Sequence, residues 1–225
     1  MTTTKSVCVL SVTALWLFGG VALHSNTNAA MPGMYLPAIE PISGDSLYQL
    51  PVELTAANGA SLKLTALRGK PLIVTMFYSR CTSVCPMLTH GLQQLMSRLS
   101  TLERARVQIV MVSFDSAGDS PATLTAFKSE HQIAGDNWLI AKASARDVRS
   151  LAAALGIQYR ELPDHSYNHS AVVTVTDRGG TVRARTSDLN DSDGTFIAAV
   201  RLQVHPQMQL VAGAGFVEHL NVELR

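Results

Sequence analysis

The feature that most constrains the fold of this 225-residue chain is a cysteine pair directly after a long apolar run. Residues 72–78 (Leu-Ile-Val-Thr-Met-Phe-Tyr) read as a strand buried on both faces, as in a parallel sheet. Cys81 and Cys85 follow, and Pro86 suits the first turn of a helix, where its missing N–H costs nothing. We therefore expect both thiols at a strand-to-helix junction, where free backbone N–H groups and the helix dipole favour ionisation of one or both sulfurs.

The spacing of the two cysteines leaves a redox role and a metal-binding role open. Residues four apart on a helix have Cβ atoms about 5–6 Å apart, which is slightly wide for a relaxed disulfide, whose Cβ atoms prefer ~3.5–4.5 Å. A bridge here would close a small loop and remove little chain entropy, so a purely structural disulfide is poorly motivated. A thiolate pair can attack a partner's disulfide, or it can bind a soft metal ion with a third ligand.

The first 30 residues predict a signal peptide or a membrane anchor. Lys5 precedes an apolar stretch over residues 7–23, which is at the lower edge of the ~17–25 residues that span a bilayer. Residues 24–30 offer a poor cleavage site, so both fates stay open. Either fate carries the rest of the chain across a membrane, to the bacterial periplasm or the periplasmic face of the inner membrane, and leaves Cys8 removed or embedded.

The composition of the chain fits one folded domain with extensions. Hydrophobic residues make up 47% of the chain and charged residues 16%, which is enough for a well-buried core. A net charge of +1 without a Lys/Arg cluster argues against nucleic-acid binding, which needs a basic stripe. Residues 31–49, rich in Pro, Gly and Ser, are expected to be a linker, residues 50–204 the folded domain, and residues 205–225 a tail of unknown role.

The apolar pattern predicts strands that alternate with helices. Expected strands are a hairpin of 52–55 and 61–64, buried strands at 72–78 and 107–114, a short strand at 138–141, and a hairpin of 171–175 and 181–186. Expected helices cover 86–102, a segment from 120, 145–155 and 193–204. This order describes an α/β fold with a central mixed β-sheet flanked by helices and an N-terminal β-hairpin extension. With the thiols after the first buried strand, the architecture is thioredoxin-like.

Two histidines are candidates for a third metal ligand. His169 immediately precedes the apolar run 171–175 and should be held at the end of a sheet strand, whereas His165 lies in a loop of Pro, Asp, Ser and Asn residues. Taken alone, a histidine that is hydrogen-bonded near a hairpin is more common than a ligand. The remaining histidines are interpreted as surface or packing residues: His90, His131, His205 and His219.

From about residue 50 to 204, the chain resembles the Sco/SenC family, exported thioredoxin-fold proteins that act in assembling the binuclear copper centre of cytochrome c oxidase. The motifs that carry the resemblance are Leu67-Arg68-Gly69-Lys70-Pro71, Phe77-Tyr78-Ser79-Arg80-Cys81-Thr82-Ser83-Val84-Cys85-Pro86, Val112-Ser113-Phe114-Asp115, Asp119-Ser120-Pro121 and His169-Ser170. The resemblance implies that Cys81, Cys85 and His169 match the family's copper ligands. It also implies a copper-receiving oxidase subunit, or another copper protein, as the partner.

The chain departs from the family pattern at three places near these motifs. Thr82-Ser83 stand where the family often has Pro and Asp, Asn168 stands where Asp often precedes the histidine, and Ser116 stands where Pro usually follows Asp115. None of these departures removes a ligand. They do remove nearby carboxylates that could recognise a partner or orient a ligand.

The ligand set makes copper chemically sensible in its own right. Two soft thiolates and an imidazole suit Cu(I), and they can hold Cu(II) if another donor completes a flatter geometry, whereas structural zinc wants four protein ligands. The sequence thus favours a copper metallochaperone. The alternative is a thiol-disulfide oxidoreductase in which Cys81 attacks a partner's disulfide and Cys85 resolves the mixed disulfide. A thiol peroxidase is less favoured, because no supporting donors around a single activated thiolate are readable.

Overall fold

The apolar run that ends at Tyr78 forms the central strand of a mixed sheet. The computed structural model describes residues 42–188 and 190–205. In it, all six side chains of β3 (Leu72–Phe77) are buried. This strand lies between β4 (Gln108–Ser113), which runs parallel to it, and β8 (Val173–Thr176), which runs antiparallel. The prediction of a strand buried on both faces is confirmed.

The other strands extend this sheet to seven, in the order β2-β1-β5-β4-β3-β8-β9. β5 (Trp138–Ala143) runs parallel to β4. The edges are the predicted N-terminal hairpin of β1 (Glu53–Ala56) and β2 (Ser61–Lys63), and on the other side β9 (Val182–Thr186). A separate two-stranded ribbon of β6 (Tyr159–Glu161) and β7 (Tyr167–His169) was not expected from the sequence.

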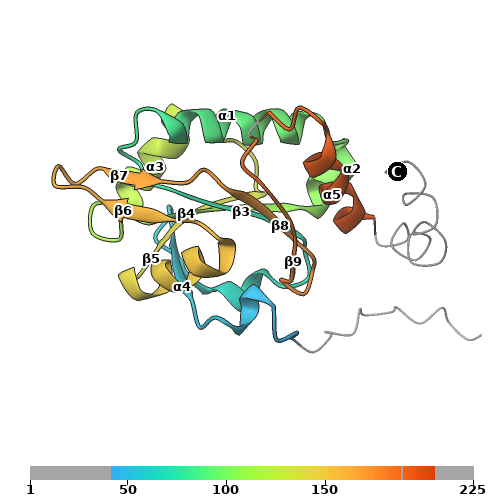
Figure 1. The fold of residues 1–225 in the computed structure, drawn as a ribbon, viewed down its shortest axis with the longest axis horizontal. Helices are drawn as coiled ribbons and strands as arrows, with labels where there is room; N and C mark the ends of the chain where they lie inside the picture. The colour runs from blue at the N-terminus through green and yellow to red at the C-terminus, as the bar shows by residue number, and fades with distance from the viewer. Residues whose placement is uncertain (1–41, 189, 206–225) are drawn as a thin grey trace, which may run out of the picture. The chain divides into compact units, whose positions relative to one another are not determined.

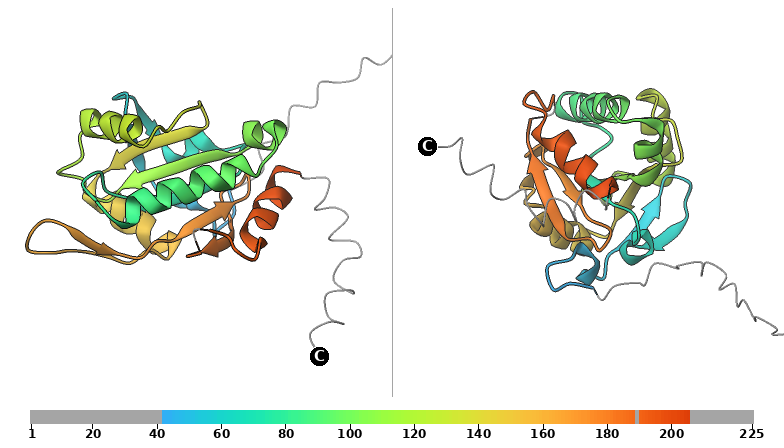
Figure 2. Two further views of the ribbon diagram at one scale, coloured as in Figure 1. Left: turned by 90° about the horizontal axis from the view of Figure 1, so that it is seen from above. Right: turned by 90° about the vertical axis from the view of Figure 1, so that its right-hand side faces the viewer.

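Helices cover both faces of the sheet. Figure 1 shows α1 (Val84–Ser97) and α3 (Pro121–Glu130) on one side and α4 (Ala145–Leu155) on the other. The remaining helices are α2 (Thr101–Arg106), α5 (Thr195–Val204) and the short 3-10 helices η1 (Leu47–Gln49) and η2 (Leu64–Leu67). This arrangement is the thioredoxin-like fold that the sequence predicts, and Figure 2 shows its layers from two further sides.

The predicted helix over 86–102 is wrong at its C-terminal end, because two helices occupy this stretch. α1 ends at Ser97, and Ser100 caps α2 through a capping box in which its hydroxyl accepts from the Glu103 N–H and the Glu103 carboxylate accepts from the Ser100 N–H. Leu102, which continued the apolar pattern, is 71% exposed. The reciprocal capping of Ser100 and Glu103 therefore starts a second helix, although the apolar periodicity of the first continues to Leu102.

The folded part begins before residue 50, inside the stretch predicted as a linker. Leu47 and Tyr48 are buried, and the Leu47 N–H donates to the Gly180 carbonyl at 3.0 Å. Gly180 has φ +83°, and a Cβ there would also overlap the Tyr48 ring. The predicted export segment and residues 206–225 lie outside the described residues. Within 42–188 and 190–205, no helix has both the length and the apolarity needed to cross a membrane.

Candidate metal centre

The cysteine pair lies where β3 leaves the sheet and α1 begins. A turn after the strand is closed by the Cys81 N–H, which donates to the Tyr78 carbonyl at 3.2 Å. Cys85 lies in the first turn of α1, where backbone N–H groups lack helical acceptors. Its N–H donates to Cys81 Sγ at 3.3 Å. The strand-to-helix position predicted for the thiols is confirmed, and a helix N-terminal amide contacts one of the sulfurs.

The imidazole that meets the thiols is that of His169. It is the last residue of β7, so the ribbon holds it rather than the sheet strand β8 that follows. Its Nε2 lies 3.8 Å from Cys85 Sγ, and its Nδ1 lies 3.3 Å from the Ser170 carbonyl oxygen. Because a carbonyl only accepts, Nδ1 carries the proton, and Nε2 presents its lone pair to the sulfurs.

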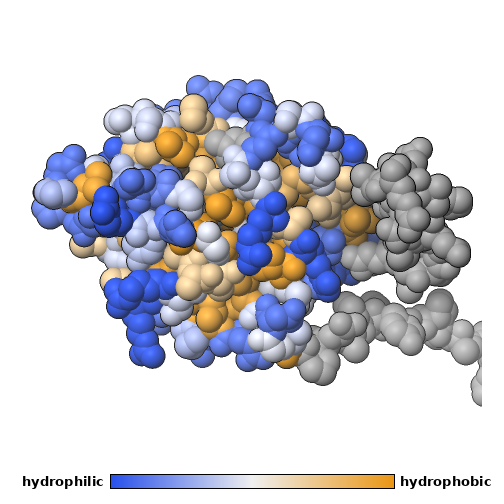
Figure 3. Space-filling view, viewed as in Figure 1, coloured by the Kyte–Doolittle hydropathy of each residue, from blue (hydrophilic) through white to orange (hydrophobic). Residues whose placement is uncertain are grey.

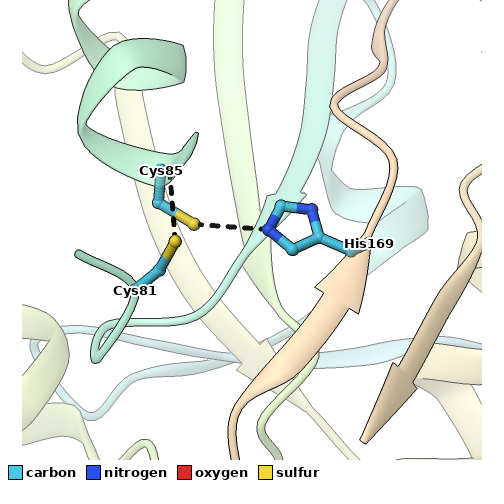
Figure 4. Close-up of side chains that lie close together, drawn as sticks. All are labelled: Cys81, Cys85 and His169. Atoms are coloured by element: carbon cyan, nitrogen blue, oxygen red, sulfur yellow. Dashed lines mark hydrogen bonds between the residues drawn. The ribbon is translucent and has the colours of Figure 1, made fainter. Parts of the chain in front are cut away.

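These three side chains converge from two separate segments of the chain (Figure 4). The sulfurs of Cys81 and Cys85 and the ring nitrogen of His169 all lie within 4.8 Å of one another. Bonds of ~2.3 Å to sulfur and ~2.0–2.1 Å to nitrogen, at angles of ~110–120°, would place S and N about 3.5–3.8 Å apart. The observed separation of 3.8 Å between Cys85 Sγ and His169 Nε2 therefore fits a shared metal ion.

The two thiols differ in acidity. Burial acts to raise the pKa of Cys81, but hydrogen bonds from Cys85 and from the N–H groups of Ser83 and Val84 outweigh it and lower the pKa. Burial raises the pKa of Cys85, which is fully buried. The prediction that one or both sulfurs ionise readily is confirmed through Cys81 alone, because desolvation of Cys85 exceeds the helix-terminal effect there. Burial also lowers the pKa of His169, which favours the neutral, ligating form.

Aromatic rings enclose His169. Its ring centroid lies 4.9 Å from that of Phe114, which follows β4, and 6.0 Å from that of Tyr78. Phe114 also stacks on Tyr159 at 5.4 Å and meets Tyr167 at 5.0 Å. These contacts dock the inner face of the ribbon on the end of the sheet. They leave the imidazole half-buried in a shell of low polarity.

The other described histidines lie elsewhere. His165, the second candidate from sequence, occupies the ribbon tip, where its exposed ring pairs with Glu161 at 2.7 Å. Hydrogen bonds or ring contacts hold the rest outside the cluster: His90 with Gln94, His131 with Phe127 and His205 with Glu103. His219 and Cys8 fall outside the described residues.

Sequence reasoning assigned no role to several polar residues around the thiols. Asp119 is fully buried and accepts from the Ser79 N–H at 3.0 Å, which ties the cysteine loop to the segment after β4. Asp115 is 3% exposed and pairs with Arg80 at 2.8 Å. Both carboxylates belong to motifs named in the sequence analysis. Their position directly after a buried strand could have predicted that they lie near the thiols. Their partners could not be predicted from the sequence, because Arg80 and Ser79 follow a different strand, β3.

Comparisons with known proteins agree with this picture. A family model described as SCO1/SenC matches residues 41–204. The SCO1 protein homolog of Bacillus subtilis (strain 168) is 27% identical over 81 residues, which cover 36% of this chain and 42% of the relative. A Stutzerimonas stutzeri protein named as a candidate copper-binding protein is 24% identical over 136 residues, which cover 59% of this chain and 65% of the relative. The matched part thus spans less than two thirds of either relative.

A likeness to a solved structure supports the fold. Bradyrhizobium japonicum ScoI with copper bound superposes with a TM-score of 0.57 at 19% sequence identity, covering 68% of this chain and 97% of that chain. Identity at this level bears on the fold alone. The family model, by contrast, matches well over half of the sequence, including both cysteines and His169. The chain therefore belongs to the SCO1/SenC family.

Proposed function

We propose that the protein is a copper metallochaperone whose cargo is held by Cys81, Cys85 and His169. The observation that carries the proposal is the convergence of two sulfurs and an unprotonated imidazole nitrogen within 4.8 Å. Two soft donors and one imidazole suit Cu(I). Among the described residues, the cluster has these three members, so it lacks the fourth protein ligand that structural zinc prefers. The copper-bound B. japonicum relative supports the same reading.

The unequal thiols suit a site that must both load and release its cargo. Cys81 ionises readily, so it can meet an incoming ion first. The buried Cys85 keeps its proton until a metal displaces it, which makes loading release a proton and makes affinity depend on pH. With three protein donors, a position stays open to an acceptor's ligand. Cargo can then pass by ligand exchange, without a free ion.

We propose an oxidase subunit as the acceptor and the periplasm as the site of delivery. Membership in the SCO1/SenC family supports this acceptor, because a solved relative is described as a member of the Sco family of cytochrome c oxidase assembly proteins. The location follows from Lys5 and the apolar stretch over 7–23, which predict export by a cleaved signal or an anchor. Residues 1–30 fused to a reporter that works only outside the cytoplasm should give signal. A full-length cytoplasmic product would contradict the proposed location.

A second candidate function, thiol-disulfide reduction, is favoured by the acidity difference. The Cys81 thiolate would attack one sulfur of a partner disulfide and form a mixed disulfide, and a partner thiolate would leave. The Cys85 thiol would lose its proton, attack Cys81 Sγ and release the second partner thiol. Two electrons pass to the partner, and a Cys81–Cys85 disulfide remains. This reaction needs no histidine, so His169 separates the two functions.

Copper titration of the reduced full chain in a Cys8→Ser background tests the proposal. One Cu(I) per chain should bind. Cys81→Ser or Cys85→Ser should abolish binding, and His169→Ala should weaken it, while the matched change His165→Ala should leave it unchanged. Reductase activity that survives His169→Ala, combined with no copper binding by the parent chain, would overturn the chaperone proposal in favour of the reductase.

A further inference from the structure

Arg80 reaches across the end of the sheet from the residue next to Cys81. Its Nη2 donates to Asp115 Oδ2 at 2.8 Å and to the His165 carbonyl at 3.1 Å. The first acceptor follows β4, and the second lies at the tip of the β6–β7 ribbon. One guanidinium therefore joins three segments that are far apart in sequence: the cysteine loop, the end of β4 and the ribbon that carries the histidine.

Asp115 extends this connection into the ribbon itself. Asp115 is 3% exposed, its carboxylate accepts from the Gly118 N–H at 2.7 Å, and its charge acts on the Tyr167 phenol in β7. A Cβ at Gly118 would overlap the carboxylate, so glycine is needed for this approach.

Tyr167 and His169 share one face of β7. Side chains two residues apart on a strand point the same way, and both rings pack on Phe114, at 5.0 and 4.9 Å. A change in the position of Tyr167 therefore alters the ring packing that also holds the imidazole. The path from Arg80 to the candidate ligand runs through Asp115, Tyr167 and the Phe114 ring that Tyr167 and His169 share.

The ribbon has little else to hold it. Each strand has three residues, and neither pairs with the seven-stranded sheet. An isolated two-stranded hairpin is at best marginally stable in water. The ribbon projects from the body (Figures 1 and 2), and its far end is covered mostly by hydrophilic residues (Figure 3). Apolar packing therefore acts at its base, and Arg80 supplies the contact at its tip.

We infer that Arg80 is a positioning residue: it clamps the β6–β7 ribbon to the cysteine loop and so holds His169 in reach of Cys81 and Cys85. The inference deepens the proposed function and rests on it where copper is concerned. An exposed ion pair alone contributes little. Here, however, the acceptor is buried, and removal of Arg80 would leave the Asp115 charge without its cation. Loss of the clamp should free the histidine while the thiols, held by the core, stay in place.

The test compares Arg80→Ala with the matched change Arg160→Ala, which removes an exposed arginine from the outer face of the same ribbon. The full chain is used in a Cys8→Ser background, with Cu(I) affinity measured by competition with a chromophoric chelator. Arg80→Ala should weaken binding about 10–100-fold, the usual effect of removing a contact that orients a ligand. It should add nothing to His169→Ala, because both changes remove the same ligand.

A readout without metal separates this inference from the proposed function. In the reduced, metal-free chain, hydrogen exchange of the amides over 159–169 should become at least about tenfold faster in Arg80→Ala, with exchange in β3 and β4 unchanged. Wild-type exchange rates in the ribbon of Arg80→Ala would overturn the clamp. The clamp would also be overturned if Arg80→Ala lowered the Cu(I) affinity of His169→Ala further. If the parent chain binds no copper, the chaperone proposal fails, and the exchange data still decide the clamp.

Discussion

Replacement of Asp119 by Asn should destabilise the fold and loosen the cysteine loop. The fully buried carboxylate accepts hydrogen bonds from the Ser79 N–H at 3.0 Å, the Ser113 hydroxyl at 2.5 Å and the Ser79 hydroxyl. An Asn amide offers one oxygen acceptor and an NH₂ group that only donates. The Asn oxygen can keep the Ser79 N–H and the Ser113 hydroxyl as donors, while the NH₂ group meets the Ser79 hydroxyl, which must turn and accept. All three hydrogen bonds therefore lose their charged acceptor.

The size of the effect follows from these contacts. Hydrogen bonds to a charged acceptor contribute about 1.5–3 kcal/mol, and those to a neutral acceptor about 0.5–1.5 kcal/mol. Each of the three bonds would change from a charged to a neutral partner and would weaken by about 1 kcal/mol. The expected loss is therefore about 3 kcal/mol, which is at the high end for a single substitution.

Urea unfolding of the reduced, metal-free chain measures this loss. Asp136→Asn is the matched control, because Asp136 is exposed and the same chemical change there should stay within about 0.5 kcal/mol. The midpoint should fall for Asp119→Asn without a change in slope, which reports the surface exposed on unfolding. A loss below about 1 kcal/mol would refute the reasoning, because the charge of the acceptor would then contribute little to these three hydrogen bonds.

Other outcomes concern pH and the sulfurs. The pKa of Glu103 is lowered to about 2, chiefly by hydrogen bonds from Ser100. Since an unfolded Glu titrates near ~4.3, this stabilisation is present above about pH 4 and lost toward pH 2, so the unfolding free energies of wild type and Glu103→Gln should converge over that window; a constant difference would contradict this. Limited alkylation of the reduced, metal-free chain near neutral pH should modify Cys81 before the fully buried Cys85, whose pKa is raised; mass spectrometry that finds equal labelling would argue against the acidity difference. Oxidation of the pair should abolish copper binding, because it removes both thiolates, and copper should stabilise the reduced form; a thiol-disulfide potential that copper leaves unchanged would assign metal and redox chemistry to different groups.

Much of the fold could be predicted because its signals are local. The near-continuous apolar runs of β3 and β4 predict strands that are buried on both faces. The bounds of α4 follow from its ends: Ser144 caps the first turn, and Gly156 adopts φ +71° at the C-terminus. The break between α1 and α2 was also readable, because Ser100 and Glu103 have capping-box spacing, but the apolar periodicity concealed it.

The ribbon was not predicted, because its strands have only three residues each, although its turn holds local contacts such as the hydrogen bond from the Ser166 N–H to Asp164. Residues 159–161 and 167–169 are short and polar, and their strands form on rings and charges that other segments supply. His169 could therefore be placed next to the thiols only by resemblance. The sequence pattern placed it at the end of the sheet strand that follows. The contacts of Arg80 were hidden for the same reason: its acceptors lie 35 and 85 residues further along the chain.

The donors at the site are thus held with unequal strength. The sulfurs are fixed by a turn after a fully buried strand and by the first turn of α1, so their positions can change only if the core changes. The imidazole is fixed by ring packing and by a clamp whose guanidinium side chain is 54% exposed. Loss of the Arg80 contact should therefore release His169 while the fold stays intact. The proposed copper cargo would then be held by two sulfurs alone, so Arg80→Ala should weaken copper binding without unfolding the chain.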